Sequence, residues 1–126
     1  YDVKDGLGIE MVLGAGLPVS VITASDTPAI ATRLRKLRIP HARFGVRDKL
    51  PVLQALCAEL GIGLAQVLHM ADDVNDLPVL RAVGFPVAVA DAVDAVRDAC
   101  IHVTARPGGR GAVREVCDLL LRARAA

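Results

Sequence analysis

Polar side chains that can bind a phosphate and a divalent cation recur at the ends of short apolar segments. Thr23 closes the first segment, Lys49 begins the helical pattern after the second, and Asp72 and Asp73 close the third. Mg²⁺ prefers oxygen ligands, few of them from protein, with substrate phosphate completing its shell. A lysine ammonium acts on phosphate oxygens as a point charge. A hydroxyl with nearby backbone N–H groups can hold another phosphate oxygen. The set predicts a phosphate-and-magnesium site.

Each of these residues also has a simpler interpretation. A threonine at a strand end is usually a turn residue, and a lysine at a helix start is usually solvated. Asp72, Asp73 and Asp76 fit a turn followed by a helix N-cap, positions that aspartate favours. However, residues 72–76 hold four acidic or amide side chains after an apolar strand, which is costly without a cation. We therefore interpret Asp72 as the metal ligand, with Asp73 and Asp76 in support.

The elements that position these residues alternate along the chain. Short apolar runs predict strands, and apolar residues at helical spacing predict the helices between them. Strand and helix in alternation with short links favour an α/β fold, a three-layer doubly wound parallel sheet that binds ligands at the carboxyl ends of its strands. The predicted strands are residues 19–23, 42–44, 67–71, 85–89 and 101–103, and the predicted helices are residues 27–37, 48–60, 76–83, 92–99 and 112–124.

Composition narrows the class of protein. The chain has 126 residues, enough for one domain, and 53% of them are hydrophobic but only 2% aromatic, which predicts an aliphatic core. A net charge of +1 and the scarcity of aromatic side chains for base stacking argue against nucleic acid or an anionic membrane as partner. No apolar run approaches the length of a membrane span. Three cysteines without a CxxC pair argue against a zinc site and favour the cytoplasm.

The order of the site residues separates two kinds of parallel-sheet protein. In receiver domains the acidic pair precedes the threonine and the lysine, whereas here Thr23 and Lys49 come first. This order resembles motifs two, three and four of the haloacid dehalogenase superfamily. The chain resembles most closely the capless 3-deoxy-D-manno-octulosonate 8-phosphate phosphatases, over nearly its whole length. The segments that carry this resemblance are residues 3–9 (V-R/K-D-G-x-G-I), 72–78 (D-D-x-x-D-x-P), 87–92 and 108–115.

The resemblance implies a Mg²⁺-dependent phosphatase that acts through an aspartyl-phosphate, with Lys49 and Thr23 binding phosphate. The family's first motif, D-x-D-G-x-x-T-D, supplies the nucleophile and the general acid and base. It would precede Val3, and this sequence does not contain it. The chain is therefore expected to be one domain without its N-terminal strand and nucleophile. A second departure is Ala71, where the family usually has glycine.

Substrate selection and assembly also follow from the resemblance. It implies a 2-keto-3-deoxy sugar-acid phosphate as substrate, either octulosonate 8-phosphate or nonulosonate 9-phosphate, and a homotetramer in which a neighbour covers each site. Ser25, Arg33 and Lys36 occupy positions that help set substrate length, and Arg110 lies in a glycine-rich tail that can reach a substrate. The simpler interpretation of that tail is a glycine loop before a helix. His41, His69 and His102 have no ligand spacing and are interpreted as structural.

Two hypotheses from different classes remain. The first is the phosphatase described above. The second is a non-catalytic oligomerisation domain of an acylneuraminate cytidylyltransferase, a protein in which the same domain occurs. The absence of the first motif from this sequence supports the second hypothesis. The sequence upstream of Tyr1 discriminates between them.

Overall fold

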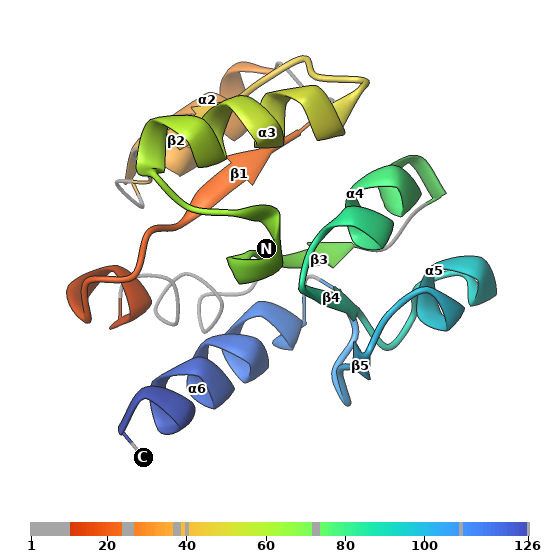
Figure 1. Cartoon of the computed structure of the whole chain (residues 1–126). Helices are drawn as coiled ribbons and strands as arrows, with labels where there is room; N and C mark the ends of the chain where they lie inside the picture. The colour runs from red at the N-terminus through yellow and green to blue at the C-terminus, as the bar shows by residue number, and fades with distance from the viewer. Residues whose placement is uncertain are drawn as a thin grey trace.

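A computed structural model describes residues 11–23, 27–36, 39, 41–71, 74–108 and 110–125 (Figure 1). The strands are β1 (Ser20–Ile22), β2 (His41–Arg43), β3 (Leu68–Ala71), β4 (Phe85–Ala88) and β5 (His102–Val103). The helices are α2 (Pro28–Lys36), α3 (Lys49–Leu60), α4 (Leu77–Ala82), α5 (Asp94–Asp98) and α6 (Ala112–Ala125), with 3-10 turns η1 (Leu64–Gln66) and η2 (Val74–Asp76). The predicted alternation of strands and helices is confirmed. Within the described ranges, no helix has the length and apolar character of a membrane span.

Every strand pair in the described residues is parallel. β1 pairs with β2, with Ser20 opposite His41. β4 lies between β3 and β5, with Leu68 opposite Phe85 and Val87 opposite His102. Because paired strands are parallel, the residues that follow them lie at one edge of each sheet. The carboxyl ends of the strands are the edge at which sheets of this kind bind ligands.

The core is aliphatic, as the composition predicts, and has two parts joined by α4. Leu80 packs with residues of β3, β4, α5 and α6, whereas its neighbour Val79 packs with Leu53 and Cys57 of α3. Successive residues of a helix point in different directions, so α4 contributes one side chain to each part of the core. This packing fixes the start of α3 relative to the end of β3, which the candidate site requires.

The strands form two sheets rather than the single sheet that the alternation predicts. β4, which has a neighbour on each side, is buried from Pro86 to Ala88. In contrast, β1 and β3 each have one neighbour in the described part of the chain, and Val21, Ile22 and His69 are only half-buried. Inner strands of a doubly wound sheet are normally covered on both faces. The half-burial of these residues agrees with the single described neighbour of each strand.

Two glycines set the path from α3 into β3. Gly61 ends α3 in the left-handed conformation, at φ 69°, and this conformation favours glycine because it has no Cβ. Gly84 donates its N–H to the Leu64 carbonyl at 3.0 Å. A Cβ on Gly84 would lie 1.9 Å from the Ala65 carbonyl oxygen, so only glycine allows this approach. The 3-10 turn between these glycines was not predicted from the sequence.

Candidate active site

Thr23 and Lys49 lie at the same end of the β1–β2 sheet. Thr23 follows β1 directly, and its N–H donates to the Arg43 carbonyl at 3.0 Å. The Thr23 carbonyl accepts from the N–H of Val46 at 2.9 Å. The loop after β2 is therefore folded against the end of β1, and three residues beyond Val46 the chain reaches Lys49, the first residue of α3. The role of these two residues in phosphate binding stays a prediction.

Lys49 is also joined to the end of β3, through a buried carboxylate. Its Nζ donates to Oδ1 of Asp76 at 2.9 Å. The same oxygen contacts Nε2 of His69, on β3, at 3.1 Å. The side chains of Lys49, Asp76 and His69 are 12%, 5% and 17% exposed. A buried carboxylate is stable only when it is paired and hydrogen-bonded, and Asp76 has both a charged partner and a second donor.

The environment of Asp76 keeps its carboxylate ionised. Burial alone would raise the pKa of Asp76, but hydrogen bonds from His69 and Lys49, together with their charges, hold the pKa below its ordinary value. A negative carboxylate in turn holds the Lys49 ammonium by a charge-assisted hydrogen bond. An ammonium has three donors, and Asp76 occupies one of them. The contact therefore orients a cation that can still bind an anion.

The lowered pKa of Asp76 predicts a loss of stability in acid. A group whose pKa is lower in the folded state contributes stability above its unfolded pKa, about 3.9 for aspartate, and loses it as pH falls through the folded value. The difference in unfolding free energy between the wild type and Asp76→Asn is therefore expected to be constant above about pH 5 and to shrink below about pH 4. Urea unfolding across this pH range measures it. A difference that grows in acid would contradict the assignment.

The segment after β5 is held at the carboxyl end of β4. The buried hydroxyl of Thr104 accepts from the N–H of Ala90 at 3.1 Å and donates to the Arg106 carbonyl at 2.6 Å. Further along, the N–H of Gly108 donates to Oδ1 of Asp91 at 2.8 Å. These bonds join the segment to the residues that follow β4, which places the exposed Arg110 at this edge of the sheet.

The carboxylate of Glu115 on α6 also holds this segment. It accepts from the N–H groups of Ala105 and Arg106 at 3.0 Å. The glycine-rich tail is thus both a loop before a helix, as the simpler interpretation has it, and a segment fixed near the carboxyl ends of β4 and β5.

α2 lies in the crossover from β1 to β2. It begins after the end of β1 and leads back toward the start of β2, so its last residue, the exposed Lys36, lies at the end of the helix that is farther from the carboxyl edge. Its nine residues span about 13 Å. The backbone of Arg33 lies in the last half of this helix, and Ser25 is outside the described residues.

The two principal metal candidates, Asp72 and Asp73, lie outside the described residues. They fall between Ala71, which ends β3 in an extended conformation that alanine adopts freely, and Val74, which begins η2. Among the described residues, no group of three or more His, Cys, Asp or Glu side chains could hold a metal ion. The donor chemistry of Asp72 and Asp73 suits Mg²⁺, and their ligation stays a prediction.

His69 is the site residue that the sequence did not reveal, since it was interpreted as structural. One signal was available. Side chains alternate along a strand, so His69 shares a face with Ala71, the residue that immediately precedes the acidic cluster. A polar residue on that face, two positions before the cluster, is placed to contact it.

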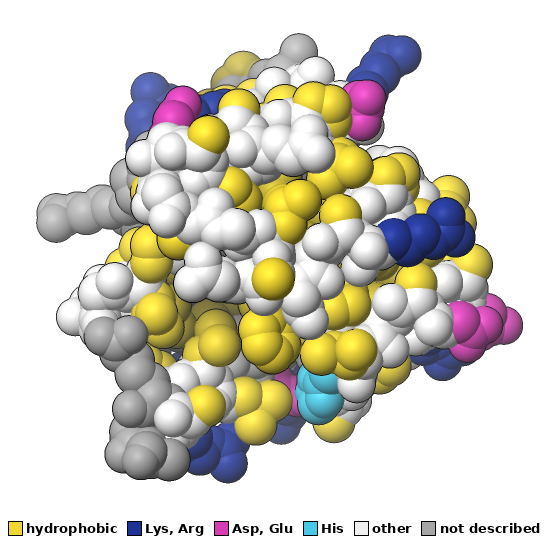
Figure 2. Space-filling view, in the orientation of Figure 1, with side chains coloured by type: hydrophobic (Ala, Val, Ile, Leu, Met, Phe, Trp, Pro, Cys, Tyr) yellow, Lys and Arg dark blue, Asp and Glu magenta, His cyan; other side chains and the backbone are white. Residues whose placement is uncertain are grey.

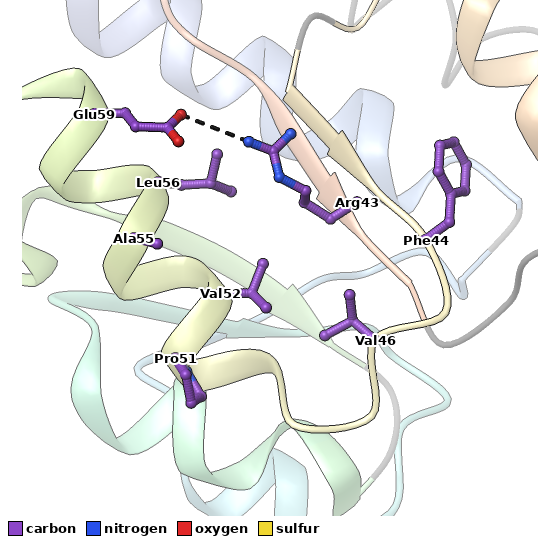
Figure 3. A pocket seen from close by; sticks show the side chains of 8 residues that line it. All are labelled: Arg43, Phe44, Val46, Pro51, Val52, Ala55, Leu56 and Glu59. Carbon is purple, nitrogen blue, oxygen red and sulfur yellow. Dashed lines mark ion pairs between the residues drawn. The ribbon is translucent and has the colours of Figure 1, made fainter.

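A separate cavity lies on the flank formed by β2 and α3 (Figure 3). It has a volume of about 350 Å³ and is mostly apolar, with an ion pair of 3.6 Å between Arg43 and Glu59 at one end. Its lining residues are Arg43, Phe44, Val46, Pro51, Val52, Ala55, Leu56 and Glu59. None of the candidate site residues contributes to this cavity.

Comparison with known proteins identifies the family. Residues 46–115, more than half of the chain, match the model of the haloacid dehalogenase-like hydrolases. The chain belongs to this family. It is 41% identical over 123 residues to the 3-deoxy-D-manno-octulosonate 8-phosphate phosphatase of Yersinia pestis, a match that covers 98% of this chain and 66% of that protein. The chain thus spans just under two thirds of the length of this relative.

Solved structures agree with the family assignment. The 3-deoxy-D-manno-octulosonate 8-phosphate phosphatase of Moraxella catarrhalis, in complex with a magnesium ion, a phosphate ion and a KDO molecule, is 36% identical with a TM-score of 0.94. That match covers 98% of this chain and 71% of the other. The cobalt-bound phosphatase of Haemophilus influenzae is 36% identical with a TM-score of 0.96, covering 99% and 73%. The α/β fold predicted from the sequence is that of this family.

Proposed function

We propose that this chain is the phosphate-binding part of a Mg²⁺-dependent phosphatase whose substrate is a 2-keto-3-deoxy sugar-acid phosphate, either octulosonate 8-phosphate or nonulosonate 9-phosphate. The observation that carries the proposal is the Lys49–Asp76 contact of 2.9 Å. It brings a cation to η2, the turn that follows β3 in the chain, in a member of a hydrolase family. The phosphatase relatives of Yersinia pestis and Moraxella catarrhalis support the substrate class.

Each residue has a distinct role in the proposed reaction. The Lys49 ammonium stabilises the charge that develops on the transferring phosphoryl group. The Thr23 hydroxyl and neighbouring backbone N–H groups bind a further phosphate oxygen. Asp72, supported by Asp73 and Asp76, holds Mg²⁺, which supplies Lewis-acid stabilisation of phosphate oxygens when it is bound. These groups bind and stabilise, and none of them is a nucleophile.

The nucleophile is assigned to a segment that precedes Val3 in the protein. The family's first motif would supply an aspartate that forms an aspartyl-phosphate and a second that moves the proton. The two separate sheets support this assignment, because a strand between β1 and β3 would give each the second neighbour that it lacks in the described residues. Figure 2 shows apolar side chains gathered around a hollow between α3 and α6, which further apolar chain would cover.

This assignment predicts that the 126-residue chain alone has negligible phosphatase activity. Binding groups cannot replace the covalent route that a nucleophile provides. Phosphate release would be measured with the purified chain and with the protein extended upstream to include a D-x-D-G-x-x-T-D segment. Activity only in the extended protein is expected. Robust turnover by the 126-residue chain would show that its own residues supply the nucleophile.

Assembly completes the proposed site. We assign the substrate carboxylate to cations from a neighbouring subunit, with Arg33 and Lys36 of α2 and Arg110 of the tail as candidates. Ser25 is kept as a candidate that helps set substrate length. The direction of α2, away from the carboxyl edge of its own sheet, supports this placement of Lys36. Symmetric closure makes a homotetramer the favoured state. A cytoplasmic location stays a prediction from cysteine usage.

A further inference from the structure

The contact between His69 and Asp76 is not used by the proposed chemistry. His69 lies in the middle of β3, and its Nε2 is 3.1 Å from Oδ1 of Asp76, the oxygen that also accepts from Lys49. Asp76 belongs to η2, and Lys49 to α3, so one oxygen joins three elements. In the described residues, no buried side-chain nitrogen or oxygen lacks a hydrogen-bond partner. Asp76 therefore has two partners, and loss of either Lys49 or His69 leaves its buried carboxylate with one.

A single lysine contact does not fix a carboxylate. The aspartate χ2 torsion is broad, so with Lys49 alone the two groups can move together along the flexible lysine side chain. A second donor from a strand removes that freedom, since the backbone of β3 is held by its ladder to β4. His69 is the only described side chain besides Lys49 that contacts Oδ1 of Asp76. His69 therefore fixes the position of the Asp76 carboxylate relative to β3.

We propose that His69 is a positioning residue, which holds the Asp76 carboxylate so that the Lys49 ammonium points at the substrate phosphate. This inference rests on the proposed function, because the phosphate is the group that Lys49 is aimed at. It predicts that the nitrogen at the position of Nε2, rather than the bulk of the ring, is what matters.

Two amide variants separate these possibilities. In His69→Gln the side-chain amide N–H can occupy the place of Nε2, whereas in His69→Asn it stops one methylene short. His69→Asn is expected to lower kcat about tenfold with little change in KM, because misplacing a catalytic group reduces transition-state binding. His69→Gln is expected to restore most of kcat. His102→Asn, a change at an exposed histidine of β5, is the matched control and should leave kcat unchanged.

A double substitution tests whether His69 acts through Lys49. In the full-length protein, including any residues that precede Tyr1, His69→Asn should cause no further loss of kcat when Lys49 is already methionine. Equal losses in both backgrounds, or a loss in His69→Gln as large as in His69→Asn, would overturn the proposal. Urea unfolding of each variant confirms that the proteins compared are folded.

A measurement without catalysis separates this inference from the proposed function. The effects of His69→Asn and Lys49→Met on the urea midpoint should be non-additive, since both act on Asp76. Additive effects would overturn the positioning role even in an active phosphatase. Non-additive effects in a protein that releases no phosphate from any sugar-acid phosphate would instead overturn the proposed function and retain the cluster.

Discussion

Replacing Lys49 by methionine is expected to lower kcat for sugar-acid phosphate hydrolysis at least about 100-fold, the range seen when one preorganised charge or donor is removed from a transition state. Lys49 is 12% exposed and 2.9 Å from the Asp76 carboxylate, so its ammonium lies in a poorly solvated position where charge acts strongly. Steady-state phosphate release measures the loss. KM should change less than kcat, because charge on the phosphoryl oxygens is redistributed during transfer.

The same substitution is expected to cost about 3 kcal/mol of unfolding free energy, because it leaves a buried carboxylate with one partner fewer. Assays therefore belong well below the melting temperature of the variant. Arg47→Met is the matched control, since Arg47 is an exposed cation two residues earlier, in the loop before α3. If both variants lost activity equally, general surface charge rather than the Lys49 contact would explain the effect.

Replacing Asp72 by asparagine is expected to raise the Mg²⁺ concentration for half-maximal activity at least about tenfold. Mg²⁺ is usually held by one or two protein carboxylates, and loss of one charged ligand weakens binding by more than 1.4 kcal/mol, the free energy of a tenfold change. Phosphate release as a function of Mg²⁺ concentration measures the shift. Excess Mg²⁺ should restore part of the activity.

The control for Asp72→Asn is Asp94→Asn. Asp94 is an exposed residue of α5 that pairs with Arg97 on the same helix, so its loss changes net charge without touching the candidate site. The Mg²⁺ requirement of this variant should equal that of the wild type. An unchanged Mg²⁺ requirement in Asp72→Asn would remove Asp72 from the metal site.

The local pattern of the sequence predicts most of the fold. Apolar runs and helical spacing locate the five described strands and the helices from α2 to α6, because apolar residues recur at strand or helix spacing in these segments. The predicted and observed elements differ at their ends. The sequence predicts one helix over residues 76–83, whereas the structure has the 3-10 turn η2 up to Asp76 and then α4. Pro78 lies in the first turn of α4, where proline is tolerated.

Pairing between distant strands is less predictable. The alternation predicts one sheet, whereas the described strands form two, because pairing between strands that are distant in sequence depends on tertiary contacts that their own residues do not specify. The residues of the candidate site also differ in how far the sequence predicts them. Lys49 and Asp76 were predicted from motif order, while the His69 contact depends on how η2 folds back onto β3, which strand periodicity alone does not specify.

The central claim is tested most directly by phosphate release from 3-deoxy-D-manno-octulosonate 8-phosphate and from a nine-carbon analogue, with and without Mg²⁺, by the full-length protein with any residues that precede Tyr1. The account predicts Mg²⁺-dependent hydrolysis of one of these sugar-acid phosphates, with a kcat/KM well above that for a generic aryl phosphate. A folded protein with an upstream D-x-D-G-x-x-T-D segment that releases phosphate from none of these compounds would contradict it.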